Sequence, residues 1–347
     1  MDAKLEFGLD TFGDVTRGAD GALLGQDEVL RNVLAEAVLA DSVGVDVIGL
    51  GEHHRDDFAI SSPEVVLGVI AGQTRRIRLG TAVTVLSTDD PVRLFQRFST
   101  LAALVPGRAE VVLGRGSFTE SYPLFGHALE DYETLFEEKL DLFAKLVRES
   151  EVTWSGTTRA PLSRQRVYPP LDPELGPEGL PVWIGVGGSP QSVVRAVRHD
   201  MPVMLAIIGG DPRRFLPFVE LYRRAQQKAG LPERALGVHS PGHVADTDAE
   251  AREAAFSGYR ELHDRIGSER GWPPMARADF DREVDHGSMY VGAPETVARK
   301  IAATVRALGL ARFDMKYSMG TLHHEALMRS VELYGSRVIP MVREMLA

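Results

Sequence analysis

The sequence predicts a closed (β/α)8 barrel, in which eight strands alternate with helices. Three observations support this prediction. Short runs rich in β-branched residues recur eight times, an amphipathic helical pattern follows each run, and the runs are apolar almost throughout. Val45–Leu50, which reads Val-Asp-Val-Ile-Gly-Leu, is one example. Strands of this kind are typical of a parallel sheet that helices cover on both faces.

The eight predicted strands are short and evenly distributed. They are Leu5–Asp10, Val45–Leu50, Ile77–Val85, Ala109–Leu113, Val182–Val186, Val203–Ile207, Leu236–His239 and Arg312–Met315. The helices between them are expected to begin near Asp27, Pro63, Asp90, Asp131, Ser189, Asp211, Asp248 and Pro294, and a last helix spans His324–Leu346. Thr247 and Glu250 have the spacing of a capping box, which marks a helix start.

Two segments are longer than an ordinary connection. Glu151–Pro181 is interpreted as a hairpin insertion after the fourth helix. Gly267–Gly287, rich in Gly, Pro and charged residues, is expected to be a long loop before the eighth helix, where it could close over a site. Neither segment marks a domain boundary, because cutting there would divide the barrel. Residues 1–347 are therefore predicted to form a single domain.

Composition excludes several classes of function. Among the 347 residues, Lys and Arg number 39 and Asp and Glu 49, and the net charge of -10 argues against a nucleic-acid or anionic-membrane partner. The absence of cysteine excludes disulfides, thiolate nucleophiles and iron–sulfur clusters. We expect no membrane segment, because the longest clean apolar run is about residues 203–208, and we expect a cytoplasmic location.

Active sites of barrel enzymes lie where the strands end at their carboxyl side. His53 and His54 follow the second strand and are acid–base candidates, because imidazole titrates near neutral pH. Consecutive side chains diverge, so we expect only one of them to face the mouth of the barrel. The alternatives are a solvated histidine and one hydrogen-bonded within its loop. A metal site that includes Glu52 is a further alternative, but we expect no metal because the first strand lacks a His-x-His motif.

A candidate phosphate site follows the fifth strand. Gly187 and Gly188 allow a close approach to the backbone, and Ser189 and Ser192 add hydroxyls at the start of a helix. Arg115, between two glycines at the end of the fourth strand, suits phosphate or carboxylate recognition. A tight turn and a structural salt bridge remain alternatives for these two features. A dinucleotide-binding fingerprint is excluded, because its third glycine and its acidic residue are absent.

The motifs at the strand ends occur in a characteristic order. They are Gly51-Glu52-His53-His54, Arg78-Leu79-Gly80-Thr81-Ala82-Val83, Asp90-Pro91-Val92-Arg93, Pro106-Gly107-Arg108, Gly114-Arg115-Gly116 and Val291-Gly292-Ala293-Pro294-Glu295. In order and spacing they resemble the luciferase-like monooxygenase family, the flavin-dependent barrels of the bacterial-luciferase group. The resemblance extends from about residue 5 to residue 345.

The resemblance implies a barrel that binds FMN at its mouth, with the ring against the segment Ala82-Val83-Thr84 and a cis peptide between the first two. It implies phosphate contacts at Arg115 and in the segment Gly187-Gly188-Ser189, together with Ser192. His53 corresponds to a histidine near the reactive edge of the flavin. Two departures stand out: Gly188 replaces an acid, and an arginine is replaced near Tyr132 or Glu133.

The activity that the resemblance implies is that of a flavin-dependent monooxygenase. Reduced FMN and dioxygen would form a C4a-hydroperoxyflavin, which would oxidise a small organic substrate that resembles an aldehyde or ketone. Because no NAD(P)H fingerprint is present, a separate flavin reductase would supply the reduced flavin. A homodimer is also implied. The alternatives are an oxidoreductase that transfers hydride with the deazaflavin F420, and a flavin-binding protein without turnover.

Overall fold

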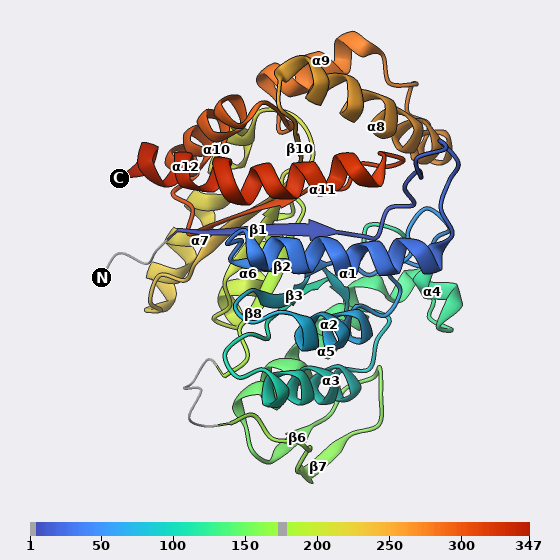
Figure 1. The fold of residues 1–347 in the computed structure, drawn as a ribbon. Coiled ribbons are helices and arrows are strands. Elements are labelled where there is room, and N and C mark those ends of the chain that lie inside the picture. The colour runs from blue at the N-terminus through green and yellow to red at the C-terminus, as the bar shows by residue number, and fades with distance from the viewer. Residues whose placement is uncertain (1–4, 173–178) are drawn as a thin grey trace.

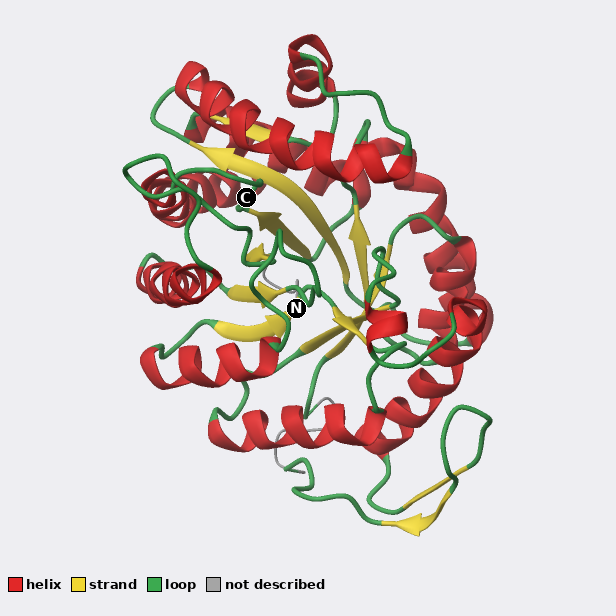
Figure 2. Ribbon diagram, turned by 90° about the vertical axis from the view of Figure 1, so that its right-hand side faces the viewer, coloured by secondary structure: helices red, strands yellow, loops and turns green. Residues whose placement is uncertain are grey.

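A computed structural model describes residues 5–172 and 179–347. It confirms the predicted (β/α)8 barrel (Figure 2). Each of the eight predicted strands has its counterpart, and one of them is divided in two. The barrel strands are β1 (Glu6–Thr11), β2 (Val47–Leu50), β3 (Arg78–Thr81) with β4 (Thr84–Val85), β5 (Val111–Gly114), β8 (Val182–Val186), β9 (Val203–Ala206), β10 (Leu236–Val244) and β12 (Arg312–Lys316).

The strands are all parallel, in the ring order β1, β2, β3 with β4, β5, β8, β9, β10, β12. The ring closes at β5, which pairs with β4, and the residues just before β5 are bridged to β3. There the backbone N–H of Leu79 donates to the Arg108 carbonyl at 2.7 Å, and that of Glu110 donates to the Leu79 carbonyl at 3.0 Å. Parallel pairing brings the carboxyl ends of all strands to one edge, which is the mouth of the barrel.

Helices cover the outside of the barrel (Figure 1). They are α1 (Gln26–Ser42), α2 (Pro63–Gln73), α3 (Pro91–Leu104), α4 (Ser121–Leu124), α5 (Tyr132–Arg148), α6 (Pro190–Arg198), α7 (Leu216–Ala229), α8 (Asp248–Arg270), α9 (Arg277–His286), α10 (Pro294–Leu308), α11 (His324–Leu333) and α12 (Ile339–Leu346). The predicted capping box at the start of α8 is present, with both reciprocal hydrogen bonds of Thr247 and Glu250. Within the described ranges, no helix is long and apolar enough to cross a membrane.

The predicted hairpin insertion is confirmed. Strands β6 (Val152–Trp154) and β7 (Leu162–Gln165) pair antiparallel and lie at the bottom of Figure 1. The rest of the insertion includes residues 173–178, which lie outside the described residues.

The prediction of a long loop at Gly267–Gly287 is wrong. Helix α8 continues to Arg270, and α9 occupies Arg277–His286, so that only a short connection separates two helices. Phe280 and Val284, four residues apart, are the buried face of α9. The high density of charge around this short apolar pair concealed its helical spacing, although i,i+4 ion pairs on the exposed face also stabilise a helix.

Strand β10 is longer than predicted. It runs past His239 to Val244 through Pro241 and Gly242, two residues that are unfavourable in strand interiors. Tertiary pairing overrides this tendency, because β12 pairs with the first part of β10, and the short strand β11 (Tyr290–Gly292), which was not predicted, pairs with the last part. The long β10 carries the chain beyond the mouth before α8 begins.

The interior of the barrel contains a buried ion-pair network around Arg312. Its Nη1 lies 2.5 Å from a carboxylate oxygen of Glu110, and its Nη2 lies 2.7 Å from a carboxylate oxygen of Asp314. All three side chains are almost fully buried. Burial raises the pKa of Asp314 to about 6, although Arg312 opposes the shift. Glycines make room for the network, since a Cβ on Gly8 would lie 2.1 Å from an Asp314 oxygen.

Removal of Glu110 should destabilise the barrel strongly. In Glu110→Ala, the Arg312 guanidinium loses one carboxylate partner, and water cannot reach it as a replacement. We expect a loss of about 3–5 kcal/mol in the free energy of unfolding. Urea unfolding followed by circular dichroism measures this loss. Glu220→Ala, which removes an exposed ion pair with Arg224, is the control. Equal losses in the two variants would contradict a structural role for the network.

Candidate active site

The segment between β3 and β4 forms one wall of the mouth. The peptide bond between Ala82 and Val83 is cis, as the resemblance predicts. The Ala82 N–H donates to the Leu50 carbonyl at 2.9 Å, and the Val83 carbonyl accepts from the Glu52 N–H at 3.0 Å. Both residues are half-buried, whereas Thr84 is fully buried. Ala82 and Val83 therefore form a shelf, anchored through its backbone to the turn after β2.

Glycines allow close packing around this shelf. A Cβ on Gly114 would lie 2.5 Å from the Val83 side chain, which packs against the buried cluster of Val112, Trp183 and Met204. A Cβ on Gly51 would lie 2.2 Å from the ring of Phe12. Larger residues at either position would push the shelf or the Phe12 ring out of place, so the strand ends support a flat apolar surface here.

His53 lies in an aromatic cage formed by Phe12, Phe58 and Phe118. Its ring centroid is 4.4, 4.6 and 5.1 Å from theirs, respectively. Burial lowers the pKa of His53 to about 3, and the positive charge of Lys316 contributes to the shift. At neutral pH the imidazole is therefore uncharged. It can accept a hydrogen bond or a proton, although its low pKa makes it a weak base, and it cannot act as an imidazolium acid.

His54 has different surroundings. Its Nε2 lies 2.9 Å from a carboxylate oxygen of Glu52, whose other oxygen accepts a hydrogen bond from the Val85 N–H at 2.8 Å. The ring packs edge-on against Phe125. The two histidines thus diverge as expected from their positions in the sequence, and the contacts of His54 tie the turn after β2 to β4.

Two arginines converge on Ser192, near the start of α6. Arg115 and Arg195 donate to its hydroxyl at 3.5 and 3.3 Å. Both guanidinium groups also bind the carboxylate of Glu133, one at each oxygen. The Arg195 and Ser192 side chains are buried, whereas that of Glu133 is 62% exposed. Two guanidiniums around an exposed carboxylate form an anion site that an internal group occupies.

The turn before α6 leaves space beside this anion site. A Cβ on Gly187 or Gly188 would meet no atom within 4 Å, and Gly188 has a φ of +108°, in the region that favours glycine. Ser189 precedes the first residue of α6, but its hydroxyl donates to Gln191 rather than capping the helix. These predicted residues thus surround the positive end of α6, where an anion is stabilised.

Sequence reasoning missed Arg195. Its spacing was the available signal, because Ser189, Ser192 and Arg195 are three residues apart and three-residue neighbours lie on one face of a helix. Tyr132 and Glu133, near which the resemblance implies a replaced arginine, both lie at this site. The ring of Tyr132 lies under the Arg115 guanidinium at 4.9 Å, and Glu133 bridges the two arginines.

The end of α8 lies against the mouth. Arg55, which follows the two histidines, pairs with Glu269 at 2.6 Å, and Arg265 pairs with Asp57 at 2.7 Å. Arg270 donates to the Ser117 carbonyl and lies over the ring of Phe118, a member of the aromatic cage. The segment Gly267–Gly287, where a lid was expected, thus begins with the last turn of α8, which an ion pair attaches to the mouth.

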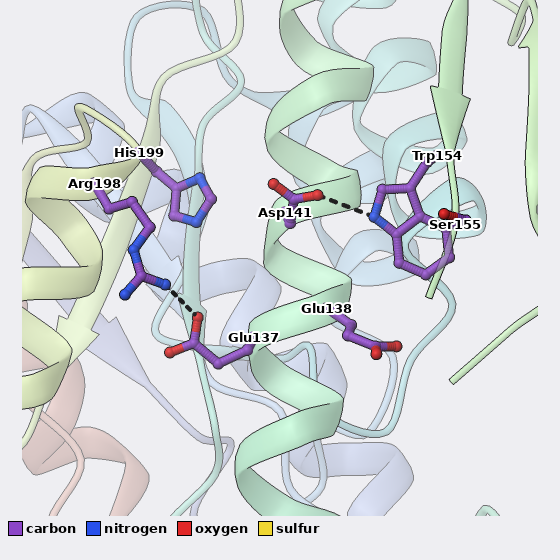
Figure 3. A pocket seen from close by; sticks show the side chains of 7 residues that line it. All are labelled: Glu137, Glu138, Asp141, Trp154, Ser155, Arg198 and His199. Atoms are coloured by element: carbon purple, nitrogen blue, oxygen red, sulfur yellow. Dashed lines mark hydrogen bonds and ion pairs between the residues drawn. The ribbon is translucent and has the colours of Figure 1, made fainter. Parts of the chain in front are cut away.

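A pocket lies outside the barrel. A pocket of about 280 Å³ opens between α5, α6 and β6, lined by Glu137, Glu138, Asp141, Trp154, Ser155, Arg198 and His199 (Figure 3). Its carboxylates already have partners: Glu137 binds Arg198, and Asp141 accepts from the Trp154 indole. Among residues 5–172 and 179–347, no three His, Asp or Glu side chains are grouped to hold a metal ion. We therefore place the candidate site at the mouth.

Comparison with known proteins identifies the family. The family model described as luciferase-like monooxygenase matches residues 11–312. The chain belongs to this family. Among curated luciferase-like relatives, the 4-hydroxyprotoasukamycin monooxygenase of Streptomyces nodosus subsp. asukaensis is 26% identical over 333 residues, which cover 91% of this chain and 88% of that protein.

Solved structures share the barrel. The oxygenating constituent of 3,6-diketocamphane monooxygenase from a Pseudomonas putida plasmid, in complex with FMN, has a TM-score of 0.78 and 20% identity, covering 97% of this chain and 98% of that one. An F420-dependent secondary alcohol dehydrogenase has a TM-score of 0.74 and 17% identity, covering 98% of this chain and 99% of that one. The same barrel thus occurs in a protein solved with FMN and in one that depends on F420.

The anion site predicts a specific pattern of flavin affinities. Arg115→Ala and Arg195→Gln should each weaken FMN binding by about 1.5–3 kcal/mol, the value of a charge-assisted hydrogen bond. Glu133→Gln should strengthen it, because the internal carboxylate no longer competes. Riboflavin, which lacks the phosphate, should bind all variants equally. Quenching of flavin fluorescence measures these affinities.

Arg198→Gln is the matched control, because Arg198 is an exposed arginine on the same helix. If Arg195→Gln changes FMN and riboflavin affinity alike, Arg195 supports the fold rather than the phosphate.

Proposed function

We propose that this protein is a monooxygenase that uses reduced FMN and dioxygen to oxidise a small organic substrate resembling an aldehyde or ketone. The whole chain, residues 1–347, would act as one barrel domain. The observation that carries the proposal is the convergence of Arg115 and Arg195 on Ser192 and the exposed Glu133 carboxylate. Two guanidiniums suit the doubly charged phosphate of FMN, and the family supplies the oxygen chemistry.

The residues at the mouth fit such a cofactor. The arginines and Ser192 would hold the phosphate, beside the open backbone of Gly187 and Gly188. The shelf of Ala82 and Val83, backed by Thr84, would support the apolar ring. Bound reduced flavin supplies the electrons that activate dioxygen. The protein contributes binding, orientation and exclusion of water.

Two groups of side chains would act around the reacting atoms. The aromatic cage of Phe12, Phe58 and Phe118 would exclude water from the mouth. His53 would accept a proton from the substrate or from the developing product, because its imidazole is uncharged at neutral pH. His54 would hold the turn that carries His53, through its hydrogen bond to Glu52.

Reduced flavin would come from a separate flavin reductase, since the sequence contains no dinucleotide-binding fingerprint. We further propose that the protein acts in the cytoplasm as a homodimer.

The second candidate is an F420-dependent oxidoreductase that transfers hydride without oxygen. It is favoured by the F420-dependent alcohol dehydrogenase that shares the barrel. Oxygen consumption separates the two proposals. We expect the protein, supplied with FMN and a flavin reductase, to consume dioxygen in proportion to added aldehyde or ketone. Substrate oxidation with F420 under nitrogen would support the second candidate instead, and tight flavin binding without either reaction would indicate a flavin-binding protein.

His53→Ala should lower substrate turnover by about 10²–10⁴-fold and leave FMN affinity near that of the wild type, because a proton acceptor contributes to the rate rather than to cofactor binding. His54→Gln is the matched control and should have a smaller effect. Steady-state rates at saturating reduced FMN measure both. Small and equal effects would contradict proton transfer by either histidine.

A further inference from the structure

A second polar pair lies inside the mouth, apart from His53 and His54. The Nδ1 of His239, on β10, lies 2.7 Å from a carboxylate oxygen of Asp10, near the end of β1. The Asp10 side chain is 1% exposed and that of His239 is 11% exposed. The other Asp10 oxygen is buried without a hydrogen-bond partner. A buried carboxylate beside an imidazole fixes the orientation of the ring and stabilises its protonated form.

This pair is next to the shelf and the aromatic cage. Gly49 separates Asp10 from the shelf, and a Cβ there would lie 3.2 Å from the Asp10 Cβ and 3.0 Å from that of Ala82. The ring of His239 is stacked on Phe12, with 6.2 Å between centroids and 12° between planes. Phe12 in turn contacts His53. The two histidines therefore pack against the same aromatic ring.

The remaining polar atom of His239 is available. Among the described residues, the His239 ring has one hydrogen bond, between its Nδ1 and Asp10. Its Nε2 therefore has no partner among these residues. Structural histidines in a protein interior usually satisfy both nitrogens. An oriented imidazole with a free nitrogen is the arrangement of a proton donor held by a carboxylate.

The charges around His239 favour its protonated form. Burial by itself would lower the pKa of His239, but the charge and hydrogen bond of Asp10 raise it above its usual value. On β12, Lys316 opposes this effect and Asp314 adds to it. His243, buried on the same strand without such a partner, shows the contrast, since burial lowers its pKa to about 4.

We propose that His239 is the proton donor of this active site and that Asp10 is its positioning residue. This inference rests on the proposed monooxygenase function and divides the proton transfers between two histidines. His53 accepts a proton, whereas His239 donates one through Nε2.

The proton balance accommodates such a donor. A monooxygenase places one oxygen atom of dioxygen in the product and releases the other as water. Reduced flavin supplies the electron pair, and the oxygen that leaves as water must gain protons. The Nε2–H bond of protonated His239 breaks as a new O–H bond forms, and the imidazole becomes neutral. It regains a proton from solvent before the next turnover.

Histidine titration by NMR tests the pair without any turnover. The probe is the full-length protein labelled at the ring positions of its 10 histidines, with the His239 signal assigned by its loss in His239→Gln. We expect His239 to keep its proton to a higher pH than a free histidine, and His53 and His243 to lose theirs well below pH 6. In Asp10→Asn the pKa of His239 should fall while that of His243 stays unchanged. A His239 that titrates below the free value in the wild type would overturn the proposal.

Turnover tests the role of the pair. We expect His239→Gln to lower oxygen-dependent turnover by about 10²–10³-fold with unchanged FMN affinity. The wild-type rate should fall as the pH rises through the pKa of His239, because the donor loses its proton, and in Asp10→Asn this fall should move to lower pH. A rate within threefold of wild type in His239→Gln, or an unshifted profile in Asp10→Asn, would overturn the role of the pair.

The two measurements separate the possible failures. Wild-type protein that consumes no dioxygen with any aldehyde or ketone would overturn the proposed function, and with it this role, whatever the NMR titration gives. Active protein with an unshifted titration would overturn the inference about His239 alone.

Discussion

The positive charge of Arg312 inside the barrel is the constraint on which the arrangement of the interior depends. A buried guanidinium is tolerated only with carboxylates in contact, and Glu110, just before β5, and Asp314, on β12, provide them. Their side chains need space, which explains a glycine at Gly8 beside Asp314. These ion-paired side chains therefore fill the base of the barrel. The small residues at the opposite end leave the carboxyl ends of the strands available for chemistry. The polar pair of Asp10 and His239 lies above this base, toward the mouth.

Local pattern was sufficient to predict much of the fold. Apolar runs and helix starts located the eight strands and their helices, because both signals depend on neighbours in the sequence. The departures have tertiary causes. The extension of β10 through Pro241 is stabilised by pairing with β11 and β12. The 10 residues of α9 bury only Phe280 and Val284, and so short an apolar pattern does not stand out among charges.

The site was predictable where a motif is contiguous and not where it is assembled by the fold. The histidine pair, the shelf and Ser192 lie in short motifs, and Arg115 lies between glycines. The partners of the other groups are remote in the sequence: Glu133 is 62 residues from Arg195, and Asp10 is 229 residues from His239. Helix and strand periodicity in the sequence does not relate residues this far apart, so only the closure of the barrel brings them together. The uncharged state of His53 likewise follows from burial rather than from its neighbours in the chain.

The attachment of α8 to the mouth has a consequence for its response to salt. The pairs of Arg55 with Glu269 and of Arg265 with Asp57 each have one partner that is about half exposed, whereas apolar packing holds much of the barrel. Dissolved ions weaken exposed charge pairs more than buried ones and leave apolar contacts intact. We therefore expect the contact between the end of α8 and the turn after β2 to loosen at high ionic strength before the barrel itself does.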